Sequence, residues 1–308
     1  MKNPFTALRR ALPTPVSAYD QKSAMLMLTP MMLVLGVVAV FPVLYSFWIS
    51  LFDLKLTRPH RVPFVWFDNY RRIFADTLFW ESTGRTVSFT VMSVLAIMVI
   101  ATLMALLLNQ EFKGRALVRT AVLVPWAIPT IVSAKMWGWM LNDQFGVINN
   151  LLVSAGLITH KIAWTAEPTY ALWTVVLVDV WKTTPFMALL ILAALQTVPK
   201  DCYEAARVDG VHPLRVFWRI TLPLIRQPLM VAIIFRLLDS LRVFDLIYVL
   251  TANGSTTISM SGFVRREMVE YGNMGFGSAA STSLFLIIML TAIIFLRLAR
   301  VKLAEDAK

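Results

Sequence analysis

A polar segment between two apolar runs reads Val198-Pro-Lys-Asp-Cys-Tyr-Glu-Ala-Ala-Arg-Val-Asp-Gly-Val-His-Pro-Leu-Arg-Val-Phe-Trp-Arg-Ile-Thr-Leu-Pro223. Its first half predicts a short helix, because Pro199 suits a first turn and Asp201 suits the positive N-terminal end of a helix. Gly210 can adopt the left-handed conformation that ends such a helix. Proline is tolerated at the first helical position, so Pro213 predicts a second helix directly afterwards. The segment therefore predicts two short helices joined by a sharp bend.

Long apolar runs lie on both sides of this segment. They occupy about 23–52, 83–109, 117–141, 169–196, 221–250 and 276–299. Each run is long enough to cross the hydrocarbon core of a bilayer. The composition agrees, because 58% of the 308 residues are apolar and 15% are charged, whereas a soluble domain is about half apolar and a quarter charged. We expect an all-α membrane protein with six transmembrane helices.

The predicted helices make one domain, residues 23–300, between an N-terminal segment, 1–22, and a tail, 301–308. The net charge is +11, and the basic residues cluster at the ends of the apolar runs. With the N-terminus in the cytoplasm, the inner segments contain sixteen of the 29 Lys and Arg residues and the outer loops contain nine. Lys and Arg favour the cytoplasmic side. We therefore expect a multi-pass inner-membrane protein, surrounded by lipid, with both termini in the cytoplasm and no nucleic-acid partner.

Several other kinds of chemistry have no matching motif in the sequence. Cys202 is the single cysteine and cannot form an internal disulfide. His60, His160 and His212 are too scattered to indicate a metal site. The chain has no Gly-x-x-x-x-Gly-Lys-Ser/Thr loop, so we expect it not to hydrolyse ATP. No acid, base and nucleophile converge on a recognisable catalytic motif, and we expect no catalytic residue.

The polar segment resembles a known signature. Glu204-Ala205-Ala206 is followed by Gly210 and then by Ile-x-Leu-Pro ending at Pro223, and this spacing is similar to the EAA loop of ABC importer permeases. A Glu-Ala-Ala helix with a glycine cap could occur in any cytoplasmic loop, but the downstream motif and the six runs favour the resemblance.

The resemblance implies the type I permease architecture with a cytoplasmic coupling helix at about 198–223. In that family the loop docks on an ATP-binding subunit, with its glutamate as the anchor and its glycine as the turn. The residues that would couple this chain to the ATPase are Glu204, Ala205, Ala206, Asp209 and Gly210.

Four further motifs resemble the maltose/trehalose branch of sugar permeases, specifically the first of two unequal subunits. They are Phe67-Asp-Asn-Tyr70, Leu123-Val-Pro-Trp-Ala-Ile-Pro129, Phe145-Gly-Val-Ile-Asn149 and Asp179-Val-Trp-Lys-Thr-Thr-Pro-Phe186. The resemblance implies a heterodimer with a second permease, two ATP-binding subunits that hold ATP and Mg, and a periplasmic solute-binding protein. This chain would hold no cofactor. The implied cargo is trehalose or maltose, or a related sugar, polyol or modified sugar.

Charged residues within the predicted spans need partners. Asp179 and Lys182 are three residues apart on one helix and can pair. The fifth span carries charges at every third position, namely Arg236, Asp239, Arg242 and Asp245. A central charge costs about 2.5–3.5 kcal/mol on the insertion scale, so these side chains cannot face lipid. Because a full helical turn takes about 3.6 residues, each step of three residues falls short of a turn and moves the side chain around the helix. The four charged side chains therefore cannot all face the same side of a pore. Ion pairing between helices and contact with cargo both remain open.

The third span contains a second group of candidates. Pro125 and Pro129 predict an interruption that leaves backbone carbonyls free to line a cavity. Trp126, Trp137 and Trp139 could offer an aromatic face to a sugar ring, although packing or an interfacial position is the common role of such residues. The full set of candidate pathway residues is Trp126, Lys135, Trp137, Asp179, Lys182, Asp239 and Arg242.

Two outer loops read as short amphipathic helices, at Phe145–Ser154 and at Phe263–Tyr271. A different class of function also fits the buried charges, because acid and base pairs in a membrane can relay protons. On that reading the chain would be a secondary sugar carrier or channel that works without ATP. Flux through the purified chain in liposomes, without an ATPase subunit, separates the two classes.

Overall fold

A computed structural model describes residues 18–254 and 256–299 of the chain. Most of the predicted N-terminal segment, 1–17, and the predicted tail, 301–308, lie outside the described residues. The described part is built from helices and connecting turns, with one isolated bridge between Phe52 and Phe64. The predicted all-α class is therefore confirmed for these residues.

Within residues 18–254 and 256–299, four helices are long and apolar enough to cross a membrane. The first is a continuous rod made of α2 (Ala18–Leu35), η1 (Gly36–Val40) and α3 (Phe41–Ser50). The other three are α5 (Thr77–Asn109), α10 (Pro168–Gln196) and α17 (Met274–Ala299). They confirm the first, second, fourth and sixth predicted runs. Six spans result if each of two bent helix pairs is one span.

The third predicted run is a bent pair. Its first arm is α6 (Arg115–Val122) with α7 (Val124–Ala127), and its second arm is α8 (Thr130–Met140), at 88° to the first. Ile128 and Pro129 between the arms have extended backbones. Because proline has no N–H, it cannot continue the hydrogen-bond ladder of α7. The predicted interruption at Pro129 is confirmed, and a straight helix over 117–141 is wrong.

The fifth predicted run is also divided. α12 (Pro213–Val216), η2 (Phe217–Thr221) and α13 (Leu222–Leu224) make one arm, and α14 (Arg226–Leu241) leaves it at 76°. The prediction of one helix to residue 250 is wrong, because α14 ends at Leu241 and α15 (Asp245–Thr251) begins anew.

Local chemistry explains the break between α14 and α15. The Ser259 hydroxyl donates to the Val243 carbonyl at 2.8 Å, which satisfies an acceptor that the break leaves free. Asp245 lies in the first turn of α15, where a carboxylate meets the positive end of the helix dipole. Arg242 and Asp245 are therefore not on the helix that carries Arg236 and Asp239, and the predicted rotation of all four around one helix does not apply.

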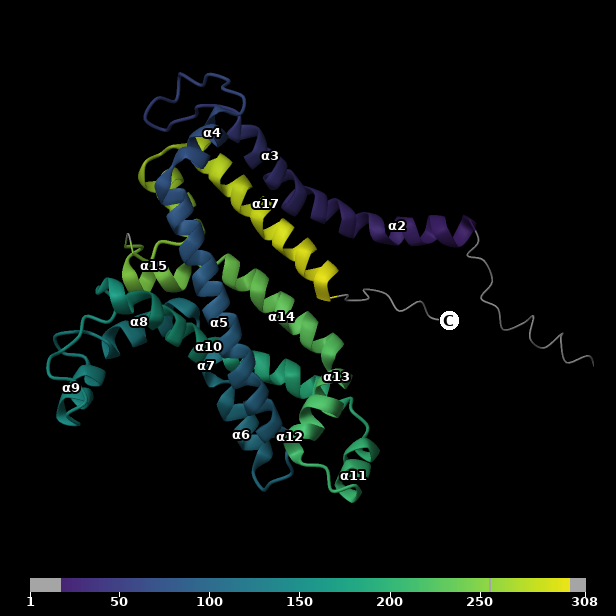
Figure 1. The fold of residues 1–308 in the computed structure, drawn as a ribbon. Helices are drawn as coiled ribbons and strands as arrows, with labels where there is room; N and C mark the ends of the chain where they lie inside the picture. The colour runs from purple at the N-terminus through teal and green to yellow at the C-terminus, as the bar shows by residue number, and fades with distance from the viewer. Residues whose placement is uncertain (1–17, 255, 300–308) are drawn as a thin grey trace, which may run out of the picture.

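The centre of the bundle is the packing of α5 along α10, with α14 against both, as Figure 1 shows. Buried residues at this junction include Ile97, Ala101, Ala188 and Ile191. Alanines let the helix backbones approach closely, which is how membrane helices gain packing contacts. α17 lies beside α3, and α15 packs against α8.

Shorter helices lie in the connections between the long ones. They are α4 (Asp68–Ala75), α9 (Val147–Ser154), α16 (Met260–Arg265) and η3 (Arg266–Glu270). The two predicted amphipathic helices are confirmed as α9 and as α16 with η3. Asn149 organises the loop around α9, because its amide donates to the carbonyls of Asn142 and Ile162 and its oxygen accepts from Trp164 Nε1 at 3.0 Å.

Candidate functional site

The segment 198–223, here called the hinge, folds as two helical pieces around a left-handed glycine. Its first piece is α11 (Lys200–Val208), which has Asp201 in its first turn. Gly210 has φ +66°, so the predicted left-handed turn is confirmed. The Gly210 N–H donates to the Arg207 carbonyl at 3.1 Å, and the Val211 N–H donates to the Ala206 carbonyl at 3.0 Å. These two bonds form a Schellman cap.

The second half of the hinge restarts at once. The His212 ring nitrogen Nδ1 accepts from the Leu214 N–H at 3.3 Å and caps α12, which confirms the predicted restart at Pro213. The Thr221 hydroxyl lies 3.3 Å from the Tyr203 hydroxyl and joins the two halves. The hinge is therefore a preformed structure rather than a slack loop.

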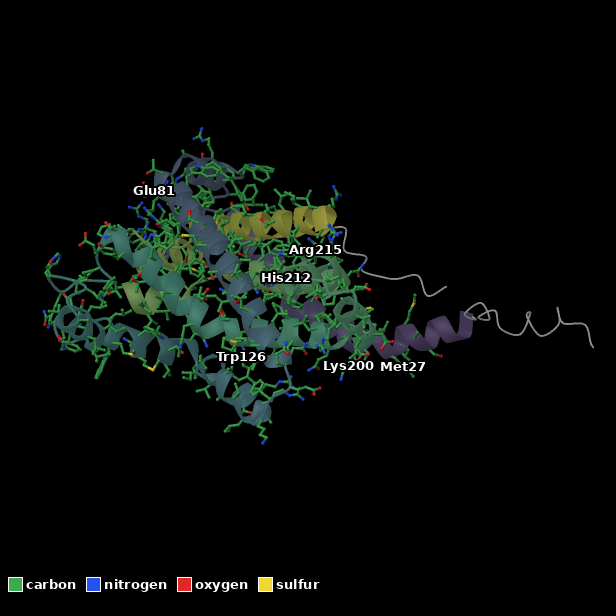
Figure 2. The ribbon with its side chains drawn as sticks, turned by 60° about the horizontal axis from the view of Figure 1, so that its bottom comes forward. Met27, Glu81, Trp126, Lys200, His212 and Arg215 are labelled. Carbon is green, nitrogen blue, oxygen red and sulfur yellow. The ribbon has the colours of Figure 1, made fainter. Side chains whose placement is uncertain are left out.

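The outer surface of the hinge is open. The Glu204 and Ala205 side chains and the helix-capping Asp209 are exposed, whereas Ala206 is buried against the chain itself. Large apolar side chains are also exposed nearby: Val208 is 88%, Leu214 66% and Trp218 64% exposed. Figure 2 shows Lys200, His212 and Arg215 of this region far from Glu81 at the opposite end of α5.

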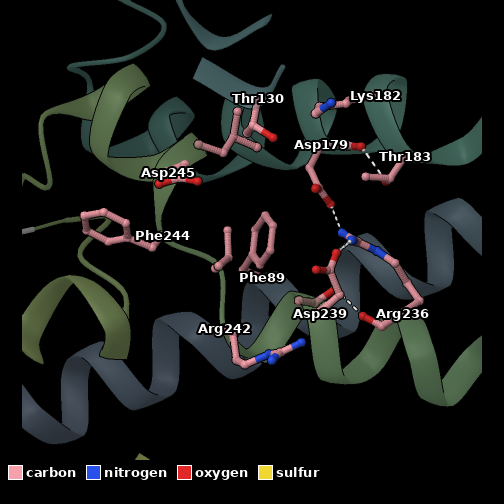
Figure 3. Close-up of a pocket in the computed structure, with 13 residues that line it drawn as sticks. Phe89, Thr130, Asp179, Lys182, Thr183, Arg236, Asp239, Arg242, Phe244 and Asp245 are labelled. Carbon is pink, nitrogen blue, oxygen red and sulfur yellow. Dashed lines mark hydrogen bonds and ion pairs between the residues drawn. The ribbon is translucent and has the colours of Figure 1, made fainter. Parts of the chain in front are cut away.

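A group of polar residues, here called the charge cluster, joins three helices of the bundle; Ser93, Asp179 and Arg236 are buried, and Asp239 lies at the exposed edge of the group. It consists of Ser93 on α5, Asp179 on α10, and Arg236 and Asp239 on α14. Arg236 donates to the Asp179 carboxylate and, at 3.1 Å, to the Ser93 hydroxyl, which in turn donates to Asp179. A second Arg236 nitrogen donates to Asp239 at 2.6 Å. The predicted Arg236–Asp239 pair is confirmed (Figure 3).

The predicted pairing of Asp179 with Lys182 is wrong. Figure 3 shows Asp179 reaching towards Arg236 while Lys182 lies apart from it. The Lys182 ammonium instead donates to the carbonyls of Ile128, at 2.6 Å, and Trp126, at 3.4 Å. Sequence spacing allowed the pair, but Arg236 reaches Asp179 from another helix and the broken third span supplies free carbonyls to Lys182.

Two adjoining hollows lie beside the charge cluster. The first has a volume of about 160 Å³ and the second about 280 Å³, and both are bordered by Thr183, Arg236, Asp239 and Arg242. Asp179, Lys182 and Asp245 border the first hollow only. The second hollow is bordered by Trp126, Phe186 and Phe235. Acidic, basic and aromatic groups thus meet in one place within the bundle.

Five of the seven candidate pathway residues border these hollows, namely Trp126, Asp179, Lys182, Asp239 and Arg242. The Trp126 ring is stacked on Phe186, with centroids 4.9 Å apart and planes within 10°. Trp137 instead packs edge-on against Trp181, at 5.5 Å. Lys135 is exposed and borders neither of the two hollows.

Some residues of this region are not among the candidates from the sequence. Ser93 has a recognisable signal, because it continues a helical row of small polar residues on α5 with Ser82, Thr86 and Thr90, all buried. Small polar residues at this spacing in an apolar helix mark a face that meets other helices. Phe186 follows Lys182 by one helical turn, whereas Phe235 has no such local signal.

These two regions define a class of protein. A hollow with opposite charges suits the passage of a polar solute through a membrane bundle, and an exposed, preformed hinge suits the docking of a separate subunit. The chain is therefore a membrane transport subunit rather than an enzyme.

The chain belongs to the family of binding-protein-dependent transport system inner membrane components, whose match covers residues 73–304. This is the permease family of ABC-type importers, and the predicted resemblance is confirmed.

Relatives match along nearly the whole chain. The trehalose/maltose transport system permease protein MalF of Thermococcus litoralis is 42% identical over 285 residues, which are 91% of this chain and 95% of that protein. The sulfoquinovosyl glycerol transport system permease protein SmoG of Agrobacterium fabrum is 35% identical over 92% of each chain. The trehalose transport system permease protein SugA of Mycobacterium tuberculosis is 35% identical over 91% of this chain and 89% of its own.

A solved structure has the same fold. A chain of a bacterial ABC transporter involved in the import of the acidic polysaccharide alginate superposes with a TM-score of 0.79 at 22% identity. The superposition covers 97% of this chain and 99% of that chain. The predicted ABC importer permease fold is thus confirmed.

Proposed function

We propose that this chain is one of two permease subunits of an ATP-driven importer of an uncharged sugar, with a disaccharide such as trehalose or maltose as its cargo. The observation that carries this proposal is the course of α14. This helix begins at Arg226, directly after the hinge, and carries Arg236 and Asp239 into the charge cluster. A displacement of the hinge would therefore be transmitted along a rigid helix to the hollows.

The lining of the hollows supports a neutral cargo. Three acids border them, Asp179, Asp239 and Asp245, and three bases, Lys182, Arg236 and Arg242. With balanced charge the site attracts neither anions nor cations strongly, but its exposed groups, Asp239, Arg242 and Asp245, can accept from or donate to hydroxyls. The stacked Trp126 and Phe186 offer an aromatic surface to the apolar face of a sugar ring. Two relatives that transport trehalose or maltose by name agree with this cargo.

The hinge is proposed to couple these movements to ATP hydrolysis in a partner. Glu204 would anchor it in a cleft of the ATP-binding subunit, Gly210 would keep its bend, and the exposed Ala205 and Asp209 would shape the contact. The exposed Val208, Leu214 and Trp218 support a docking role, since large apolar side chains on a polar surface mark interaction sites. The alanine at 206 is buried within the hinge, so its small size serves the packing of α11.

The proposed assembly contains a second permease, two ATP-binding subunits that hold ATP and Mg, and a periplasmic solute-binding protein. Most side chains of the apolar helix Ser23–Ser50 are exposed, which supports further cover by lipid or by the second permease. The protein lies in the inner membrane, and we propose that both termini and the hinge face the cytoplasm while α4, α9 and α16 face outward. ATP-driven closure of the two ATP-binding subunits on the cytoplasmic side would then push the hinge and open the hollows towards the periplasm.

Reconstitution of the assembled transporter in liposomes tests the proposal. Trehalose uptake should require external solute-binding protein and ATP with Mg inside, and it should stop when a non-hydrolysable ATP analogue replaces ATP. Liposomes that contain only the permease chains are the control, and they should show no trehalose flux in a proton gradient. Uptake by the permease chains alone would contradict the ATP-driven function.

A further inference from the structure

The hydrogen-bond partners of Lys182 are backbone carbonyls, and recognition of cargo does not explain them. It is 8% exposed, and among the described residues no carboxylate lies within 4.0 Å of its ammonium. Its two hydrogen bonds go to the Ile128 and Trp126 carbonyls at the break of the third span. A buried ammonium is costly unless its donors are satisfied, so these backbone bonds are the main reason that it can be buried here.

The two carbonyls need Lys182 for a corresponding reason. In a continuous helix the Trp126 carbonyl would accept from residue 130 and the Ile128 carbonyl from residue 132. The extended backbone at Ile128 and Pro129 removes both partners. A carbonyl within a membrane bundle must be satisfied by another group, and Lys182 supplies that group.

The site of this contact matters because Trp126 lies directly beside the break. Its ring stacks on Phe186, which is one helical turn after Lys182 on α10. One turn of α10 therefore contacts Trp126 twice, because Lys182 binds its backbone carbonyl and Phe186 stacks on its ring. Asp179, one turn earlier, binds α14 through Arg236, so the two buried charges on α10 serve different helices.

We infer that Lys182 is a positioning residue that fixes the 88° break of the third span and thereby holds Trp126 at the hollow. It acts through backbone carbonyls and does not recognise cargo. This inference rests on the proposed function only for its consequence in transport, because the geometry of the break can be measured without any cargo.

A distance measurement across the break tests the inference directly. Spin labels would be attached through Leu117→Cys on α6 and Trp139→Cys on α8, both exposed positions, in a complex whose Cys202 is replaced with serine and whose partner subunits lack cysteine. Lys182→Met should shift or broaden the distance distribution, whereas Lys182→Arg, which can still donate to both carbonyls, should preserve it. Lys135→Met is the matched control, because this lysine lies on the same broken span but is exposed.

The inference is overturned if Lys182→Met leaves the distance distribution as it is in the unmodified complex. If Lys182→Met does not assemble, Lys182→Gln takes its place, because a shorter amide should reach at most one carbonyl and give an intermediate shift. An unchanged distribution in Lys182→Gln would contradict the inference equally.

A double-mutant cycle then separates positioning from contact with cargo. Trehalose is the probe. Lys182→Met should lower the uptake rate about tenfold when Trp126 is present, but by less than about twofold in the Trp126→Ala variant. The reason is that the effects of two residues that act through one another are not additive. If Lys182→Met instead lowers uptake by the same factor with and without the Trp126 ring, the two residues act independently. Lys182 would then contact the sugar itself, and the inference would be overturned. A complex that does not transport trehalose contradicts the proposed cargo and leaves the distance measurement to judge Lys182.

Discussion

The hinge and the charge cluster obtain their shapes from contacts of very different range. Within the hinge, the Schellman bonds join residues at most five positions apart, and the contact between Tyr203 and Thr221 spans 18 positions. The exposed Lys200 also lies 3.8 Å from Glu111 outside the hinge. In the charge cluster, Arg236 contacts residues 57 and 143 positions away in the sequence. The first region is encoded by caps and turns, and the second exists only when three helices have packed.

The two regions also differ in what their side chains face. Glu204 and Asp209 of the hinge are exposed, whereas the Asp179 and Arg236 side chains are 9% and 4% exposed. Loss of a buried charge leaves its partner unsatisfied in a medium of low dielectric constant, and loss of an exposed charge does not. We therefore expect substitutions in the cluster to change stability and substitutions on the hinge surface to change transport.

The largest effect is expected at Arg236. Arg236→Met leaves the buried Asp179 carboxylate without its cation and should lower the free energy of unfolding by about 3–5 kcal/mol. Thermal unfolding of the purified complex in detergent measures the loss. The double variant Asp179→Asn, Arg236→Met removes both buried charges and should recover most of the stability. Equal unfolding temperatures for the single and double variants would mean that the ion pair does not hold the helices.

Gly210 should give the next largest effect. At φ +66° a Cβ atom costs roughly 1–2 kcal/mol, so Gly210→Ala should destabilise the hinge by that amount and reduce ATP-dependent uptake. Gly84→Ala is the matched control, because Gly84 lies within the helix α5 and has no neighbour within 4 Å of an added Cβ. Alanine there should stabilise the helix by about 0.5–1 kcal/mol. Changes of the same sign at both glycines would contradict the role of backbone conformation.

Asp239 separates the exposed edge of the charge cluster from its buried part. Its side chain is 67% exposed although it lies 2.6 Å from Arg236. Asp239→Asn should therefore change the free energy of unfolding by less than about 1 kcal/mol. The same unfolding experiment should show a far smaller shift than for Arg236→Met, and a comparable shift would mean that solvent does not screen this pair.

The smallest effect is expected beside the hinge. Glu111 and Lys200 lie 3.8 Å apart, and both side chains are 84% exposed. Pairs of this kind contribute about 0–1 kcal/mol. Glu111→Gln should leave both the unfolding temperature and trehalose uptake within experimental error, and a clear loss in either would show that this contact helps to place α11.

The sequence predicts what local chemistry controls. Gly210 and Pro213 mark the two halves of the hinge, and Pro129 marks the break of the third span, because each residue restricts its own backbone. The Arg236–Asp239 pair is also local, since one helical turn separates its members.

The failures of prediction have long-range causes. The predicted pair of Asp179 and Lys182 satisfies local spacing, but better partners come from α14 and from the broken third span. The break after Leu241 depends in part on Ser259, which supplies its hydroxyl from beyond α15. Neither partner can be assigned from a single stretch of sequence, because each requires the packed bundle.

Coupling through the hinge is tested most directly by Glu204→Ala in the reconstituted transporter, with the unfolding temperature and ATP-dependent trehalose uptake measured on the same preparation. Glu111→Ala is the matched control, because it removes another exposed carboxylate near the hinge. We predict that Glu204→Ala keeps the unfolding temperature, loses at least about tenfold in uptake, and retains less of the ATP-binding subunits on purification. Normal uptake and normal assembly in the double variant Glu204→Ala, Gly210→Ala would contradict a hinge that couples this chain to ATP hydrolysis.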